Sequence, residues 1–273
     1  MSLTLTYFAK TSIPVEVEGV LPDRLAGKSL PEIERLNIAH GNRQCALADL
    51  FSIAGDASDG RIDFEGNLAG VHHIGAGMTG GEIHVHGDAG RHVGREMAGG
   101  WIKVEGNAGD WLGGEMHGGL IQVAGNAGDF AGSAYRGSKR GMTDGTILIG
   151  GDAGDEIGAT MRRGTLVVGG SCGDAPGFNM IAGSILVFGT CGIRPGANMR
   201  RGTIGLFGAK SPPLLPTFRS AGRFRPLFLR LLFRELAQRE LPVDRARLDG
   251  DLSLFHGDMI ALGKGEVWIS NPA

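Results

Sequence analysis

The side chains best suited to chemistry are two histidine pairs. His72 and His73 are adjacent, and His84 and His86 are two residues apart, a spacing that places both imidazoles on one face of a strand. Such a pair can ligate a metal, but zinc sites need three or four protein ligands or a bound water, and the sequence fixes no third ligand. We therefore expect solvated histidines and no metal site.

The cysteines and the short catalytic motifs give no stronger signal. Cys172 and Cys191 are 19 residues apart and should stack as small buried apolar side chains, about 4.8 Å apart, too far for a disulfide. Cys45 stands alone. The sequence has no CxxC, GxSxG or HExxH, and its GxGxxG-like fragments lack the strand–turn–helix context of a dinucleotide site. We expect no catalytic residue in this chain.

A repeat of 19 residues organises most of the chain. Each unit reads M-x-x-G-x-[IL]-x-[VIL]-x-G-[DNST]-[AC]-G, and one interruption adds seven residues. Its methionines are Met78, Met97, Met116, Met142, Met161, Met180 and Met199. The two aliphatic positions alternate with other residues, which predicts a short strand with one face inward, and the glycines indicate tight corners.

These features predict an all-β solenoid, a right-handed parallel β-helix with 19-residue coils stacked about 4.8 Å apart. Helix-pair repeats need about 33–47 residues, and the six- and nine-residue periods of other β-solenoids are absent. Methionine and aliphatic columns should fill the interior. A corner column should hydrogen-bond turn backbone rather than hold a metal; it consists of Asp88, Asn107, Asn126, Asp152, Ser171 and Thr190.

The two ends of the solenoid are predicted to be capped. Residues 1–50 form the N-terminal cap, with VEVEGV as a strand and SLPEIERLNI as a helix whose Ser29 and Glu32 make a capping box. Residues 51–210 form the β-helix. Residues 211–273 contribute a C-terminal helix and a terminal strand segment, with TFRSAGRFRPLFLRLLFRELAQREL as one or two amphipathic helices and Pro226 in the first turn.

The outward strand positions change from polar to apolar along the repeats. Early positions are Glu82, His84, His86, Trp101, Lys103 and Glu105; later ones are Leu148, Val167, Leu186, Phe188 and Phe207. An apolar sheet face needs a cover. The C-terminal helix is the favoured cover, through Leu227, Phe228, Leu231, Leu232 and Leu236, with Arg230, Arg234 and Arg239 facing water. A partner subunit is the alternative.

Basic residues gather at one corner of the later repeats. The residues concerned are Tyr135, Arg136, Lys139 and Arg140 in the insertion, then Arg162, Arg163, Arg200 and Arg201 after two of the methionines. Stacked corners would place them on one ridge. Either the ridge is a solvated face, or it binds a polyanion or an acidic partner that relieves the repulsion between like charges.

Composition limits the remaining classes. The chain has 273 residues, 49 of them glycine, and a net charge of −2, so it has no bulk attraction for nucleic acid or an anionic membrane. No apolar run reaches the length of a membrane span, and MSLTLTYFAK does not read as a signal peptide. We expect a cytoplasmic protein.

With these motifs, the sequence resembles the family of formylmethanofuran dehydrogenase C subunits. The resemblance rests on GGWIKVEGNAGDWLGGEM, IPVEVEGVLPDRLAGKSLPEIERL, GNRQCALADLF and GKGEVWI. It extends more distantly to the C-terminal β-helix domain of the glutamate synthase large subunit. Arginine-rich composition favours the variant in the formyltransferase/hydrolase complexes of methylotrophic bacteria.

The resemblance implies a non-catalytic scaffold in one-carbon metabolism. Such a complex moves a formyl group between tetrahydromethanopterin and a methanofuran-type carrier and releases formate; its partners would be a formyltransferase, a metal-dependent hydrolase and a homologue of the dehydrogenase B subunit. The chain alone would bind no cofactor, and the polyglutamate tail of the carrier would suit the basic ridge. Alternatives are the C subunit of a CO2-reducing tungsten or molybdenum formylmethanofuran dehydrogenase, a glutamate-synthase-like β-helix domain, and a polysaccharide-cleaving β-helix enzyme.

Overall fold

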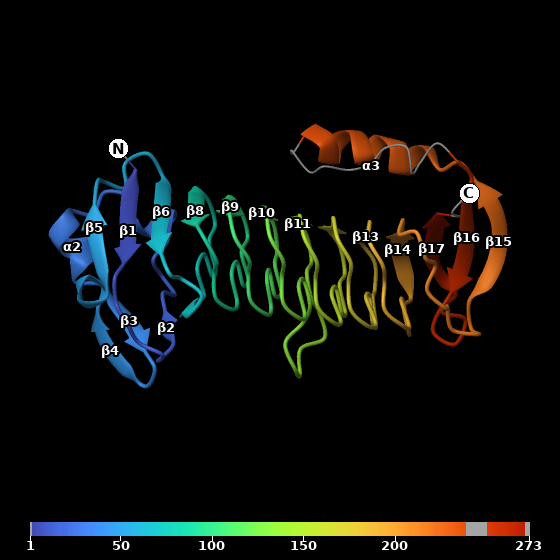
Figure 1. The fold of residues 1–273 in the computed structure, drawn as a ribbon, viewed down its shortest axis with the longest axis horizontal. Coiled ribbons are helices and arrows are strands. Elements are labelled where there is room, and N and C mark those ends of the chain that lie inside the picture. The colour runs from blue at the N-terminus through green and yellow to red at the C-terminus, as the bar shows by residue number, and fades with distance from the viewer. Residues whose placement is uncertain (1, 239–249, 271–273) are drawn as a thin grey trace.

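The large sheet dominates the computed structural model, which describes residues 2–238 and 250–270. The chain is mostly β-structure, with a 13-stranded mixed sheet, a 4-stranded sheet and few helices. Figure 1 shows the large sheet along the long axis, in the order β15-β16-β17-β14-β13-β12-β11-β10-β9-β8-β6-β1-β5. In the described ranges, no helix is long and apolar enough to cross a membrane.

The N-terminal segment contributes to both sheets. Its elements are β1 (Leu3–Tyr7), β2 (Val15–Glu16), α1 (Pro22–Leu25), α2 (Leu30–Glu34), β3 (Asn37–His40), β4 (Arg43–Ala46), the 3-10 helix η1 (Leu47–Asp49) and β5 (Phe51–Ala54). The capping box at α2 forms: Glu32 Oε2 accepts hydrogen bonds from the Ser29 backbone N–H at 2.8 Å and from its hydroxyl at 2.6 Å. β1 runs parallel to β6 and antiparallel to β5, so this segment continues the sheet of the repeats.

The repeats supply the parallel strands of the large sheet. These are β6 (Arg61–Gly66), β8 (Glu82–His86), β9 (Trp101–Val104), β10 (Leu120–Val123), β11 (Thr146–Ile149), β12 (Thr165–Val168), β13 (Ser184–Val187) and β14 (Arg201–Leu206); β7 (Val71–His72) belongs to the small sheet. Register follows the repeat, with Ile83 opposite Ile102 and Ile102 opposite Ile121. The seven repeat methionines and the first inward aliphatic of each unit are fully buried, as the periodicity predicted.

The glycine three residues after each methionine is needed for close stacking. Gly100 has φ +89°, in the left-handed region, and a Cβ there would clash with the side chain of Met78 and lie 2.6 Å from the carbonyl oxygen of Gly81. A larger residue would therefore push two repeats apart.

Two corner columns link the repeats through side chains. In the predicted column, each side-chain oxygen from Asp88 to Ser171 accepts a hydrogen bond from the backbone N–H 19 or 26 residues later, at 2.6–3.0 Å. A second column, which the sequence analysis missed, makes the same bond at 2.7–3.0 Å. It consists of Asp110, Asp129, Asp155 and Asp174.

The C-terminal segment closes the other end of the sheet with β15 (Arg219–Phe224), α3 (Leu227–Gln238), β16 (Leu252–Gly257) and β17 (Lys264–Ser270). β17 adds parallel to β14, and β16 and β15 follow antiparallel. The expectation that the segment from Thr217 onward is helical was wrong for residues 219–224. These form a strand because they pair with β16, and the φ of +113° at Gly222 is incompatible with an α-helix.

Helix α3 covers the apolar outward face of the later repeats (Figure 1). Its buried side chains are Leu229, Phe233 and Leu236, which share a core with Leu148, Val167, Leu186, Phe188, Phe207 and Trp268. The predicted contact face was wrong in part, because Leu227, Phe228 and Leu231 are exposed. Arg230 and Arg234 face solvent, and Arg239 lies outside the described residues.

Candidate functional site

The arginine pairs occupy equivalent positions two repeats apart. The backbone N–H of Arg162 donates to the carbonyl of Met142 and that of Arg200 to the carbonyl of Met180, both at 2.8 Å. Each pair directly follows a buried methionine. The first pair comes just before β12 and the second pair leads into β14, and β13 lies between these two strands. Because the backbone has the same geometry at both positions, the two arginine pairs are presented in the same way, about 10 Å apart.

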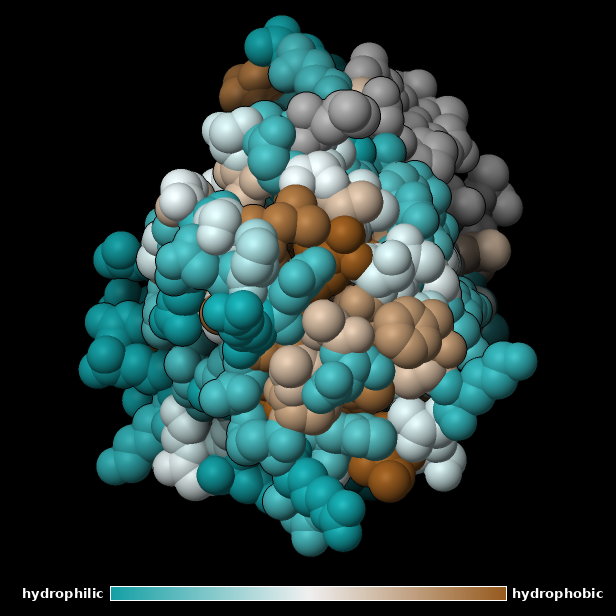
Figure 2. Space-filling view, turned by 90° about the vertical axis from the view of Figure 1, so that its left-hand side faces the viewer, coloured by the Kyte–Doolittle hydropathy of each residue, from teal (hydrophilic) through white to brown (hydrophobic). Residues whose placement is uncertain are grey.

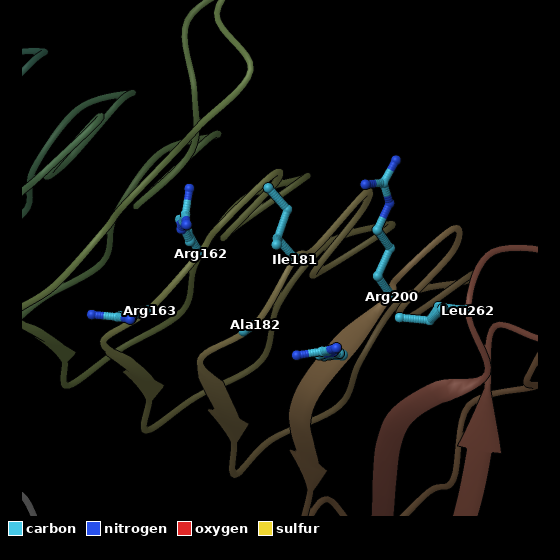
Figure 3. Close-up of a pocket in the computed structure, with 7 residues that line it drawn as sticks. Arg162, Arg163, Ile181, Ala182, Arg200 and Leu262 are labelled. Carbon is cyan, nitrogen blue, oxygen red and sulfur yellow. The ribbon is translucent and has the colours of Figure 1, made fainter.

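The two pairs enclose a groove of about 410 Å³. Its lining residues are Arg162, Arg163, Ile181, Ala182, Arg200, Arg201 and Leu262. Figure 3 shows Arg162 and Arg200 extending in the same direction on either side of Ile181. None of the four arginines forms an ion pair with a described residue, so the groove has uncompensated positive charge.

A second groove of about 600 Å³ continues from the first, because both include Arg162 and Arg163. Its other lining residues are Glu115, His117, Ser138, Arg140, Thr143 and Asp144. The carboxylates of Glu115 and Asp144 make it less positive than the first. Of the predicted site residues, the structure thus brings together Arg140, Arg162, Arg163, Arg200 and Arg201, while Arg136 and Lys139 are exposed in the insertion outside either lining.

Tyr135 is in neither groove lining, but it lies beside Glu115 of the second groove and anchors the insertion. Its backbone N–H donates to Glu115 Oε1 at 3.0 Å, and its hydroxyl lies 2.8 Å from His92 Nδ1. Its ring stacks on Trp111 at a centroid distance of 5.7 Å, under the guanidinium of Arg95 at 5.9 Å. Burial raises the pKa of Tyr135, so the hydroxyl stays protonated and able to donate.

The ring of Tyr135 joins an aromatic column that the sequence analysis did not identify. His73, His92, Trp111 and Phe130 are 19 residues apart and stack in turn at 4.6, 5.7 and 4.5 Å. All four backbones have positive φ, between 56° and 65°. Burial, with the nearby charges of His73 and Arg91, lowers the pKa of His92 to about 4. His92 is therefore neutral at pH 7 and can pair with Tyr135.

Of the histidines considered first, His72 and His86 have hydrogen-bonding partners, whereas the buried Nδ1 of His73 and Nε2 of His84 have none among the described residues. His72 Nδ1 accepts a hydrogen bond from the backbone N–H of Arg91 at 2.9 Å. His86 lies between Asp63, at 2.9 Å, and Glu105, at 3.3 Å, and the hydrogen bond to Asp63 raises its pKa. Within residues 2–238 and 250–270, no three His, Cys, Asp or Glu side chains are placed to hold a metal. Cys172 and Cys191 are adjacent free thiols.

Comparison with known proteins finds that this chain is similar to a subunit of a multi-subunit enzyme complex. No family model matches it. A chain in the crystal structure of the formyltransferase/hydrolase complex from Methylorubrum extorquens in complex with methylofuran is 37% identical, with a TM-score of 0.91 and 99% of both chains covered. The chain therefore has the fold of a subunit of that kind of complex.

The curated relatives are named as C subunits of formylmethanofuran dehydrogenases. The C subunit of the tungsten-containing formylmethanofuran dehydrogenase 2 from Methanothermobacter wolfeii is 40% identical over 90 residues, 32% of this chain and 33% of that protein. The C subunit of the molybdenum-containing formylmethanofuran dehydrogenase 1 from Methanothermobacter marburgensis is 42% identical over 91 residues, 33% of this chain and 23% of that protein. These alignments thus span at most a third of the relatives' length. The chain belongs to the family of formylmethanofuran dehydrogenase C subunits.

Proposed function

We propose that this chain is the non-catalytic scaffold, the C subunit, of a formyltransferase/hydrolase complex that uses a methanofuran-type formyl carrier. The main support is the match to a chain of the Methylorubrum extorquens complex, which is 37% identical and covers 99% of both chains. The partners are a formyltransferase, a metal-dependent hydrolase and a homologue of the dehydrogenase B subunit. The complex exchanges the formyl group between tetrahydromethanopterin and the carrier and releases formate.

The same proposal includes the fold and domain division. The repeats form a right-handed parallel β-helix over residues 51–210, capped by residues 1–50 and covered by residues 211–273. Its support is the parallel pairing on two tracks, the β8–β14 strands and a line of single bridges from Leu68 to Cys191. A rod of stacked units offers several long faces to neighbouring subunits, which suits a scaffold.

Purification of the native assembly tests this proposal. The tagged chain is isolated from its source, and its companions are identified by mass spectrometry together with their metal content. A transferase and a hydrolase without molybdenum, tungsten or iron–sulfur subunits is the expected result. Those metals with a dehydrogenase would instead support the alternative, a CO2-reducing formylmethanofuran dehydrogenase, which the tungsten and molybdenum relatives favour. A chain isolated alone would contradict both.

The arginine grooves are proposed to hold the polyglutamate tail of the carrier. A polyglutamate presents a carboxylate on each residue, and arginine pairs with carboxylates through two hydrogen bonds at once. Support comes from the uncompensated cations of the first groove, extended by Arg140 in the second. Arg136, Lys139 and the anchored Tyr135 would hold or flank the path of the tail.

Titration of poly-L-glutamate into the assembled complex tests this binding site. Replacement of Arg162 and Arg200 by alanine should weaken binding about tenfold or more, because each removes a charge-assisted pair, and should reduce its salt dependence. Arg230→Ala with Arg234→Ala, two exposed arginines on α3, is the matched control and should bind like the wild type. Equal affinity of both double variants would contradict the assignment.

A further inference from the structure

The two ends of the large sheet differ in how their edges are protected. At one end, β5 lies beside α2 and η1, and its Phe51 is 1% exposed. Figure 2 looks onto this end and shows apolar residues gathered near the middle of the face, interrupted and surrounded by hydrophilic ones. At the other end, β15 pairs with β16 on one side only, and five of its six residues are exposed. Its outer backbone groups therefore have no described strand to pair with.

Exposed apolar side chains follow directly after this edge. Phe224, at the end of β15, and Leu227, Phe228 and Leu231, on α3, are 43–69% exposed. The rings of Phe224 and Phe228 meet the buried Trp268 edge-on at 6.4 and 6.0 Å, so they are held in place. A strip of exposed apolar side chains on a fixed element marks an interaction surface. We name β15 and this strip together the edge surface.

Charge indicates what the edge surface binds. Arg219 and Arg223 are exposed on β15 and form no ion pair with a described residue. The register with β16 places Arg219 and Arg223 on opposite faces of the sheet. Pairing of two copies through β15 would therefore gather four exposed arginines at one junction, where like charges repel. A second copy is thus a poor occupant, whereas an acidic strand is a good one.

We propose that the edge surface docks a β-strand of another protein subunit. That strand pairs with the backbone of β15, presents Asp or Glu to Arg219 and Arg223, and packs apolar side chains on Phe224, Leu227 and Phe228. Backbone pairing supplies affinity in this mode, and the flanking side chains supply specificity. The inference rests on the proposed function, because it requires that the chain assembles with other subunits.

Hydrogen exchange in the purified native complex tests the docking directly. Amides of residues 219–224 should exchange at least about tenfold more slowly in the complex than in the free chain, because paired strand amides are protected. In the complex, Arg219→Glu with Arg223→Glu should abolish this protection, and Leu227→Ser with Leu231→Ser should reduce it. Neither changes the unfolding temperature appreciably, since all four side chains are exposed. Arg35→Glu with Arg43→Glu, two exposed arginines of the N-terminal segment, is the control and should leave the protection intact.

The outcomes separate the docking from the wider proposal. A complex that contains the transferase and hydrolase but leaves β15 unprotected would overturn the docking and leave the proposed function standing. Cross-links from β15 to a second copy of this chain would overturn it as well. A chain that has no such companions would contradict the proposed function itself. Cross-links from position 227 to an acidic strand of another subunit would support the docking.

Discussion

One outward column of the large sheet has a polar half and a covered half. The register joins Asp63, His84, Lys103 and Gln122 in the first half to Leu148, Val167, Leu186, Gly205 and Trp268 in the second. The inward side chains are alike in both halves and fully buried. The inward residues therefore specify the repeat, whereas the outward residues determine whether the face of the sheet is exposed to water or covered by another element.

Each half is stabilised differently. In the covered half, Phe233 of α3 meets Phe188 at 5.1 Å and Phe207 at 5.2 Å, both edge-on, so the sheet has a second apolar core. In the polar half, Asp63 accepts hydrogen bonds from Arg61 and His86. Burial alone would raise the pKa of Asp63, but these bonds lower it well below its usual range. That carboxylate is ionised at neutral pH.

The largest loss of stability is expected when an apolar residue of the covered half is replaced by a charged one. Val167→Lys places a charge under α3 without a partner, and should reduce the free energy of unfolding by about 3 kcal/mol or more. Lys103→Val makes the opposite exchange in the polar half and should change it by less than about 0.5 kcal/mol. Denaturant unfolding of both variants measures the difference. Equal losses would show that the two halves are not distinct.

Removal of the central side chain of the cover should have the next largest effect. Phe233→Ala leaves a cavity between Phe188 and Phe207 and should cost about 3 kcal/mol. It should also expose α3 to limited proteolysis. Leu231→Ala, on the exposed side of the same helix, is the control and should be nearly neutral. A neutral Phe233→Ala would mean that α3 is not the cover.

The corner hydrogen bonds should contribute equally in both halves. Asn107→Ala, in the polar half, and Asp152→Ala, in the covered half, each leave one turn N–H without its acceptor. Each should cost about 1 kcal/mol, and Asp152→Asn, which keeps an acceptor oxygen, should cost less. Thermal unfolding compares them. A much larger loss in one half would show that the backbone of the repeat also differs between the halves.

The smallest effect is a pH dependence confined to the polar half. The hydrogen bond to Asp63 and the nearby Glu105 raise the folded pKa of His86 above its ordinary 6.5. The folded state therefore binds the proton more tightly, so this stabilisation is fully present below pH 6.5 and is lost as pH rises through the raised value. It should stay under about 1 kcal/mol, because His86 is part-exposed.

The difference in unfolding temperature between the wild type and His86→Gln measures this contribution. It should be larger at pH 6 than at pH 9. His92 has the opposite sign, since its folded pKa of about 4 favours the unfolded state as pH falls below 6.5. Because both proteins retain His92, its contribution cancels in the difference. An unchanged difference across this range would show that His86 does not pair with the carboxylates when folded.

The sequence predicted the inward columns and the need for a cover, because both follow from residue types that recur every 19 positions. The second aspartate column, from Asp110 to Asp174, was equally periodic and could have been found. The contact face of α3 could also have been found, because Leu229, Leu232, Phe233 and Leu236 follow the spacing of one helical face, opposite the charged residues of the helix. The strand at residues 219–224 depends on its partner β16, which lies beyond the helix in sequence.

The candidate site could be predicted where it follows the repeat, but not where the insertion interrupts it. Arg162 and Arg200 recur with the 19-residue repeat, so their alignment follows from the spacing. Tyr135 belongs to the seven-residue insertion, which breaks the period, and its place on Trp111 and His92 is a long-range contact that no local pattern encodes.

Photo-cross-linking from the covered half tests the central claim most directly. Photo-leucine in place of Leu186 keeps the size of the side chain and reports what lies on it within the assembled complex. Cross-links to α3 of the same chain, around Leu229 and Phe233, are the predicted result, because these residues share one buried core. Cross-links from Leu186 to another subunit, with none to α3, would contradict the account and assign the apolar face to a partner.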